Sequence, residues 1–203
     1  MEQVSDVPIS IDTRHSQVAR EAIKAGADIV NDVSGGSFDP LMMKTVASLN
    51  VPYIIMHMRG TPETMQNLTK YDNVVRDVSE DLVKQSMKAE EAGIPKWLQI
   101  LDPGIGFAKD FKQNLALLKY CNEIRELVDY YPLLLGPSRK GFIGKITGET
   151  NAKERDYGTV ATCILGSIGK NRTLTPTILR VHNVRGVKQA TMVMDAVLDA
   201  KWL

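Results

Sequence analysis

Short apolar runs alternate along the chain with longer segments in which apolar residues recur every three or four positions. The short runs are typical of buried strands, and the longer segments are typical of amphipathic helices. This alternation predicts parallel strands joined by crossover helices. The expected strands cover residues 8–12, 27–31, 51–58, 98–102, 132–136 and 177–182.

Helices are expected between these strands, at 17–25, about 40–48, about 72–92, through 115–128, and from 187 to about 202. Gly26 and Gly93 end two of them, and Asp39 before Pro40 begins another. The apolar stripes define the faces that we expect to be buried. They are Val75, Val78, Leu82 and Ala89; Leu115, Leu118, Cys121 and Val128; and Val187, Ala190, Met194 and Val197.

Two architectures accommodate six strand-helix units: an open doubly wound sheet, or part of a TIM-type (βα)8 barrel, which typically needs about 250 residues. A doubly wound sheet usually carries a Gly-x-Gly-x-x-Gly turn after its first strand. Gly104-Ile-Gly106-Phe-Ala-Lys109 has lysine in place of the third glycine and follows the fourth strand. The pattern therefore favours an α/β barrel truncated to about six units.

Composition narrows the classes of partner. The 203 residues include 25 Lys and Arg against 24 Asp and Glu, so the net charge is +1. This near-neutral balance predicts no nucleic-acid partner and no membrane partner, and any anion must bind to a local cluster of cations. The most apolar stretch, 159–168, is much shorter than the roughly 20 residues that span a bilayer.

The cysteines and the amino-terminal residues bear on the compartment. Cys121 and Cys163 fall in helical patterns without metal-ligand spacing, which predicts reduced thiols in the core. Residues 1–6 are acidic and are not followed by an apolar run of signal-peptide type. A cytoplasmic or mitochondrial protein is expected.

Polar residues gather where the predicted strands end, which is where α/β folds place their chemistry. They are Asp12, Asn31, Asp32, His57, Asp102 and the run Ser138-Arg139-Lys140. Two of them have a simpler interpretation. We expect Asp32 to orient a loop, and we expect His57, which lies between two methionines, to be a core histidine.

The last strand carries Arg180 and His182, which are two positions apart and would share a face of that strand. Arginine offers a bidentate fork for phosphate, and imidazole adds a donor. With Arg139 and Lys140 nearby, these residues predict a phosphorylated substrate.

Asp12, Asn31 and Asp102 offer the complementary chemistry. Carboxylates accept hydrogen bonds and an amide both donates and accepts, which suits an amino-substituted nitrogen heterocycle. Met56 and Phe107 could supply apolar walls for a flat ligand.

Taken together, these motifs resemble one family, dihydropteroate synthase. They occur in the family's order and cover nearly the whole chain. The matching segments are Ile9-Ser-Ile-Asp-Thr13, Ile29-Val-Asn-Asp-Val-Ser-Gly-Gly36, Met56-His-Met-Arg-Gly-Thr-Pro62, Leu101-Asp-Pro-Gly-Ile-Gly-Phe107, Gly136-Pro-Ser-Arg-Lys-Gly141 and Ile178-Leu-Arg-Val-His-Asn183.

The resemblance implies that 6-hydroxymethyl-7,8-dihydropterin diphosphate condenses with 4-aminobenzoate, giving 7,8-dihydropteroate and diphosphate. It implies that Lys140, Arg180 and His182 are catalytic, and that Mg²⁺ accompanies the diphosphate. The implied pterin site is Asp12, Asn31, Met56, Asp102, Lys140 and Arg180; the 4-aminobenzoate pocket is Phe107, Ser138 and Lys140; and the diphosphate site is Arg180 and His182.

The sequence also departs from the family. Members begin with two strands that carry Asn-Val-Thr-Pro-Asp-Ser-Phe-Ser and Ser-Thr-Arg-Pro-Gly loops, and neither loop occurs in the 203 residues. We therefore expect one pterin-binding domain, residues 1–203, which holds strands three to eight and lacks part of the active site. It would be the carboxyl-terminal portion of a longer, fungal-type polypeptide.

Other interpretations stay open at this point. A corrinoid methyltransferase's pterin-binding domain shares the barrel and the Asp, Asn and Asp-Pro-Gly positions, but it is not expected to carry Ser-Arg-Lys or Arg-Val-His. A non-catalytic pterin-binding module is the other alternative.

The family resemblance also implies a homodimer formed through the last helices when the protein is full length. It implies that the metal ligand lies in the first-strand loop rather than in this chain.

Overall fold

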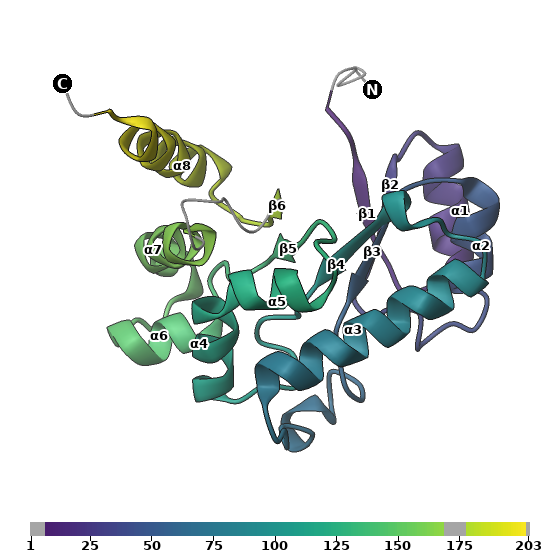
Figure 1. Ribbon diagram of the computed structural model, residues 1–203, viewed down its shortest axis with the longest axis horizontal. Helices are drawn as coiled ribbons and strands as arrows, with labels where there is room; N and C mark the ends of the chain where they lie inside the picture. Colours follow the sequence, from purple (N-terminus) through teal and green to yellow (C-terminus); the bar gives the residue numbers. More distant parts are fainter. Residues whose placement is uncertain (1–6, 169–177, 202–203) are drawn as a thin grey trace.

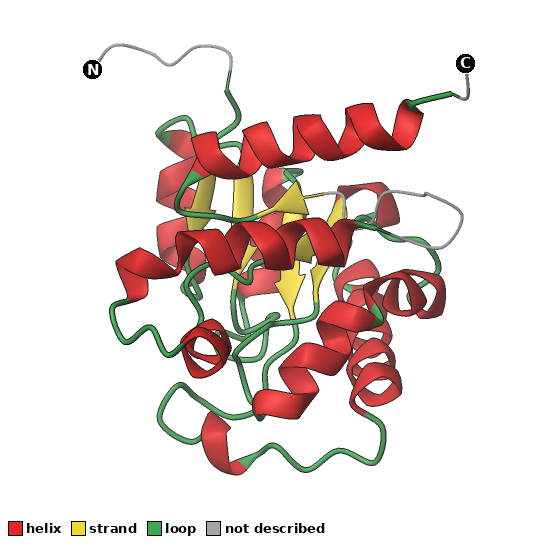
Figure 2. Cartoon of the chain, turned by 90° about the vertical axis from the view of Figure 1, so that its left-hand side faces the viewer, coloured by secondary structure: helices red, strands yellow, loops and turns green. Residues whose placement is uncertain are grey.

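The computed structural model describes residues 7–168 and 178–201. Strands lie at the centre and helices surround them (Figures 1 and 2). In chain order the elements are β1 (Ser10–Asp12), α1 (Ser16–Lys24), β2 (Ile29–Asp32), α2 (Met42–Leu49), β3 (Tyr53–Met56), η1 (Met65–Asn67), α3 (Val74–Glu91), η2 (Lys96–Leu98), β4 (Gln99–Asp102), α4 (Phe111–Lys119), α5 (Cys121–Leu127), β5 (Leu134–Leu135), α6 (Gly141–Thr147), η3 (Ala152–Arg155), α7 (Asp156–Ser167), β6 (Ile178–Leu179) and α8 (Val184–Asp199).

The described strands pair in parallel and in the order of the sequence. β1, β2, β3 and β4 form one sheet, β5 pairs with β6, and a bridge between Leu101 and Leu133 connects the two sheets. Within the described ranges, β1 pairs only with β2 and β6 only with β5. The predicted arrangement of parallel strands joined by crossover helices is confirmed.

The main core lies between the strands and the surrounding helices. Val30, Ile55 and Leu101 project from β2, β3 and β4 into one cluster with Val46 of α2 and Leu82 of α3. All four residues of β3 are buried, as expected for a strand covered on both faces. This packing fixes the positions at which the strands end.

One predicted helix is two helices. The sequence pattern predicts a single helix through 115–128, but the backbone leaves helical geometry at Tyr120, with φ −105° and ψ 28°, and this residue separates α4 from α5. The apolar stripe nevertheless stays on one side, because Leu118, Cys121 and Val128 are all buried. The hydrophobic period therefore indicated the buried face but not the break.

The carboxyl-terminal expectations need correction. β6 ends at Leu179, so Arg180 and His182 lie beyond the strand rather than on one face of it. In α8, Val187 and Met194 are buried as predicted, but Val197 is 68% exposed because no described element covers that side of the helix. Thr177 and Trp202, the predicted limits of these two elements, lie outside the described residues.

Both cysteines are free and buried, as predicted. Burial raises the pKa of Cys121 to about 12 and that of Cys163 to about 11, so both remain thiols at neutral pH. In the part of the chain that the structure describes, no helix is both long and apolar enough to cross a membrane.

Candidate active site

The strand register places four of the predicted site residues on one face of the sheet. Asp12 of β1 pairs with Asn31 of β2, and Met56 of β3 pairs with Asp102 of β4. Asn31 also pairs with Ile54, which lies two positions before Met56. Side chains alternate along a strand, so these four share the face opposite the helix-facing core.

Asp102 is the most buried carboxylate of this group. It is 7% exposed and accepts a hydrogen bond of 2.7 Å from the backbone N–H of Gly104. Burial raises its pKa to about 6, although the Gly104 N–H and the cations of Lys109, Lys140 and Arg180 favour the ionised form. A carboxylate kept in this setting is poised to accept hydrogen bonds from a ligand.

The loop after β4 requires glycine at two places. Gly104 has a φ of 69°, and a side chain there would overlap the carbonyl oxygen of His57. Gly106 has a φ of 83°, and the Lys140 side chain passes 3.0 Å from the position that a Cβ would take. Glycine thus lets this loop approach both β3 and Lys140.

Lys140 lies at the centre of the site. Its Nζ is 4.2 Å from the centroid of the Phe107 ring, which is a cation–π contact. Burial lowers its pKa, Asp102 opposes that effect, and Arg180 adds to it. Lys140 therefore sits between the carboxylate of β4 and the cation that follows β6.

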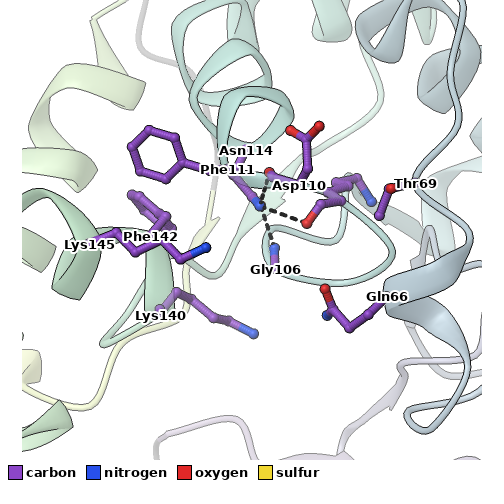
Figure 3. A pocket seen from close by; sticks show the side chains of 11 residues that line it. Gln66, Thr69, Gly106, Asp110, Phe111, Asn114, Lys140, Phe142 and Lys145 are labelled. Carbon is purple, nitrogen blue, oxygen red and sulfur yellow. Dashed lines mark hydrogen bonds between the residues drawn. The ribbon is translucent and has the colours of Figure 1, made fainter. Parts of the chain in front are cut away.

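Lys140 also lines two cavities, each of about 370 Å³. The first lies between the 103–110 loop and α6; there Asn114 accepts a 2.6 Å hydrogen bond from the N–H of Gly106, and Gln66 faces Lys140 (Figure 3). The second cavity is lined by Gly136, Ser138, Arg139, Lys140, Ala152, Lys153, Arg180 and His182.

The second cavity brings together the residues expected to bind an anion. Ser138 Oγ lies 2.8 Å from His182 Nδ1, and the backbone N–H of His182 also donates to Ser138. Arg180 donates a 2.8 Å hydrogen bond to Asp12, which comes from the other end of the chain. Arg180 and His182 thus share a cavity despite lying outside β6.

Arg139 does not join this group as a free cation. It holds Asp156 through two hydrogen bonds of 2.7 and 3.0 Å, which fix the 137–140 loop to α7. Of the two cations predicted in Ser138-Arg139-Lys140, Lys140 is available to a ligand. Arg139 instead forms a structural ion pair with Asp156.

The structural interpretation of Asp32 is confirmed. Its carboxylate accepts hydrogen bonds from the N–H and hydroxyl of Ser34, the N–H of Gly36 and the hydroxyl of Tyr53. It therefore organises the loop after β2.

His57 is a core histidine, 1% exposed, but its partners were not foreseen. Its Nδ1 lies 3.0 Å from Lys109 Nζ and its Nε2 lies 3.4 Å from Asp81, which also pairs with Arg59. The one sequence signal for this contact is Lys109 itself, which stands where a nucleotide-binding turn would have its third glycine.

The described part of the chain has no cluster of three metal-ligating side chains. Within residues 7–168 and 178–201, no three histidine, cysteine, aspartate or glutamate side chains form a group that could hold a metal ion. The cationic character of the second cavity suits an anion instead.

Comparisons with known proteins identify the family of this chain. Residues 1–182 match the family described as pterin binding enzyme. The mitochondrial folate synthesis bifunctional protein of Pisum sativum is 44% identical over 99% of this chain and 41% of its own length. The dihydropteroate synthase of Synechocystis is 45% identical over 97% of this chain and 65% of its own length.

Solved structures give the same result. The dihydropteroate synthase of Thermus thermophilus superposes with a TM-score of 0.85 and 39% identity over 94% of this chain and 73% of that one, and it has also been solved with 6HMPPP and with 4-aminobenzoate. This chain belongs to the dihydropteroate synthase family of pterin-binding enzymes, which have a TIM-barrel-like α/β fold.

Proposed function

We propose that this protein is a dihydropteroate synthase, a transferase of folate biosynthesis that joins 6-hydroxymethyl-7,8-dihydropterin diphosphate to 4-aminobenzoate and releases diphosphate. The observation that carries the proposal is the position of Lys140. It lies over Phe107 and in the electrostatic field of both Asp102 and Arg180, so one side chain adjoins all three expected subsites.

The pterin would bind to the face shared by four strands. Asp12, Asn31 and Asp102 would hydrogen-bond its aminopyrimidine edge, Met56 would pack on its ring, and Lys140 and Arg180 would complete the site. Asn31 and Asp102 are 5% and 7% exposed, so a bound ring would contact preorganised groups that water scarcely reaches. The edge of an aminopyrimidine offers the donors that carboxylates accept.

The diphosphate would bind to Arg180 and His182, and 4-aminobenzoate beside Phe107, Ser138 and Lys140. In the reaction the bond from the pterin methylene carbon to the diphosphate oxygen breaks and its electron pair leaves with diphosphate. The arylamine nitrogen then bonds to that carbon and loses a proton. Stabilising the leaving anion is electrostatic work for cations, and no nucleophilic side chain is needed.

Mg²⁺ would arrive with the diphosphate rather than reside in this chain. The described residues contain no cluster of three His, Cys, Asp or Glu side chains, so the diphosphate oxygens and water would supply most of the ligands of Mg²⁺.

We also propose that β1 to β6 correspond to the third to eighth strands of the family's barrel, with residues 1–203 as one pterin-binding domain. Two facts support this mapping: the parallel, sequential order of the described strands, and a coverage of 73% of the Thermus structure. A crystal structure in which β1 superposes on that enzyme's first strand would contradict it.

A homodimer through the last helices is proposed as well. α7 and α8 form an apolar groove whose lining includes Ile168, Val193 and Val197, all at least about half exposed. Sedimentation at micromolar concentration should show a dimer, and a monomer would contradict this assignment.

Because the relative from Pisum sativum is mitochondrial by name, a mitochondrial or cytoplasmic location is proposed.

Mass-spectrometric detection of dihydropteroate tests the proposed activity. Lys140→Ala should lower turnover by about 100-fold or more, because it removes a preorganised charge at the reacting centre. Lys88→Ala, the same change at an exposed position of α3, is the matched control. Equal rates in Lys140→Ala and the parent chain would remove Lys140 from the mechanism. Pterin binding without product would instead indicate a non-catalytic module.

A further inference from the structure

Lys109 is a buried cation that the proposed reaction does not use. It follows β4 in the 103–110 loop and is only 3% exposed. Taking an ammonium group out of water costs free energy unless its surroundings compensate for the loss. Its neighbours therefore indicate what the residue does.

Two hydrogen-bonding contacts fix the ammonium group. Nζ donates to the carbonyl oxygen of Phe107 at 2.8 Å and lies 3.0 Å from Nδ1 of His57. Phe107 belongs to the same loop, whereas His57 follows β3. Lys109 thus joins the loop that contains Gly104 and Gly106 to the end of the neighbouring strand.

The histidine acts as an acceptor in this contact. Burial and the Lys109 charge lower the pKa of His57 to about 3, so the ring is neutral. An ammonium has no lone pair, so Nδ1 must accept and Nε2 carries the proton. That N–H then faces Asp81, which Arg59 also holds at 3.0 Å.

The charges that face Lys109 come from four elements. Asp102 of β4 and Asp81 of α3 attract it, whereas Arg59 of the loop after β3 and Lys140 before α6 repel it. Asp102 is the most buried of the two carboxylates, and the described hydrogen bonds give it the Gly104 N–H as a donor. Lys109 Nζ also lies 3.4 Å from the position that a Cβ on Gly104 would take, and the N–H of Gly104 donates to Asp102. The ammonium form of Lys109 therefore places a positive charge near the carboxylate expected to bind the pterin, although burial lowers the pKa of Lys109 to about 7.

We propose that Lys109 is a positioning residue of this site: its contacts with Phe107 and His57 tie the 103–110 loop to the end of β3, and its ammonium group lies close to the Gly104 turn that holds Asp102, so that Asp102 is ready to accept hydrogen bonds from the pterin. This inference rests on the proposed function for the identity of the ligand. The hydrogen bonds and the charge arrangement do not depend on it.

Replacing Lys109 by methionine separates this role from a purely structural one. Methionine has a similar length and no charge. It leaves the buried Nδ1 of His57 without its hydrogen-bond donor and removes one of the cations that favour ionised Asp102, and losing one partner of a buried polar contact is destabilising. We expect the denaturation midpoint to fall and the affinity for 6-hydroxymethyl-7,8-dihydropterin diphosphate to fall about 10-fold, whereas a purely structural role would lower the midpoint alone.

The carbon-13 titration of the Asp102 carboxyl group gives a second readout in the ligand-free chain. Its midpoint should rise by about one pH unit in Lys109→Met and stay near the parent value in Lys109→Arg, which retains the charge. Lys145 is an exposed lysine that lines the first cavity together with Lys109, and its replacement in Lys145→Met should leave the Asp102 midpoint unchanged. An Asp102 midpoint that is equal in Lys109→Met and the parent chain overturns the proposal.

A second variant and the ligand-free titration still test the proposal if Lys109→Met does not fold or if the parent chain binds no pterin. If Lys109→Met does not fold, Asp102→Asn tests the same coupling, because the Lys109 pKa must fall when the carboxylate charge is removed; an unchanged Lys109 pKa overturns the proposal. If the parent chain binds no pterin, the proposed function fails. The Asp102 titration then still decides the role of Lys109.

Discussion

At the scale of single residues, the candidate site consists of groups that are expensive to bury. Asp102, Lys109 and Lys140 all have pKa values moved toward the neutral form by burial. Perturbed pKa values of this kind are common at functional sites, where residues needed for function often lower the stability of the fold. Removing the Asp102 charge should therefore weaken binding and raise stability above the pKa of this group.

Asp102→Asn tests this trade directly. The folded-state pKa of Asp102 is raised from 3.8 to about 6, so the folded chain binds the proton more tightly than the unfolded chain does. The resulting stabilisation is complete below about pH 4 and is lost as pH rises through about 6. Asparagine lacks this loss, so the variant should exceed the parent chain in unfolding free energy by about 2 kcal/mol at pH 8.

Urea denaturation at pH 4 and at pH 8 measures the difference. Asp72→Asn, at an exposed position before α3, is the control and should show no such growth. A stability difference that is the same at both pH values would show that Asp102 does not titrate in this window.

How far the site could be predicted follows from the same residues. Asp12, Asn31 and Asp102 were identifiable because polar residues at the ends of parallel strands meet at one edge. The contact between Lys109 and His57 was not, since it depends on how the loop after β4 folds back onto β3. Strand alternation predicted that Arg180 and His182 share one face of the last strand, which is wrong because β6 stops before either of them; the folded chain nevertheless brings both into one cavity.

At the scale of elements, two glycines restrict the backbone of the loop after β4. Gly104 combines a positive φ with a close approach to β3, whereas Gly26 has a φ of 107° with nothing within 4 Å of a Cβ. Substitutions at Gly104 and Gly26 therefore distinguish the cost of backbone strain from the cost of steric overlap.

Gly104→Ala should destabilise the chain by roughly 3 kcal/mol, because both strain and overlap act. Gly26→Ala should cost only about 1 kcal/mol, because strain acts alone. Thermal unfolding of the two variants provides the comparison. Equal losses would mean that the approach of Gly104 to His57 imposes no constraint.

The hydrophobic period predicted most helices but misplaced their ends. It identified α3, whose amino terminus is capped by the Asn73 side chain through the N–H groups of Val75 and Arg76. It could not indicate the break at Tyr120, because α4 and α5 continue the same buried stripe. Backbone breaks of this kind depend on tertiary packing rather than on the pattern of apolar residues.

At the scale of the whole molecule, one ion pair links the two ends of the described strand order. Arg180 and Asp12 are 168 positions apart, and their side chains are 57% and 47% exposed. Exposed ion pairs contribute only about 0–1 kcal/mol. The pair is therefore better explained by its position beside the ligand site than by a contribution to stability.

Arg180→Ala should lower the unfolding free energy by less than about 1 kcal/mol. It should weaken binding of the pterin diphosphate by about 10-fold or more, and binding of the pterin alcohol much less, because the lost contact is to the phosphates. Fluorescence titration with both ligands measures the difference. An equal loss for the two ligands would contradict the assignment of Arg180 to the diphosphate.

The parallel order of strands was accessible from the sequence because each strand is followed by a helix, which leaves few topologies. The chain spans 41% of its Pisum sativum relative and 65% of its Synechocystis relative, so the whole-protein activity of those relatives is a proposal for this chain. The proposed pterin site, by contrast, is assembled from residues that the structure describes.

Calorimetric titration of the 203-residue chain with 6-hydroxymethyl-7,8-dihydropterin diphosphate tests the central claim most directly. The site described here predicts saturable one-to-one binding that is at least about 10-fold weaker in Asp102→Asn, with Asp72→Asn as the unaffected control. Absence of binding, or equal binding by the parent chain and Asp102→Asn, would contradict a pterin site on this face of the sheet.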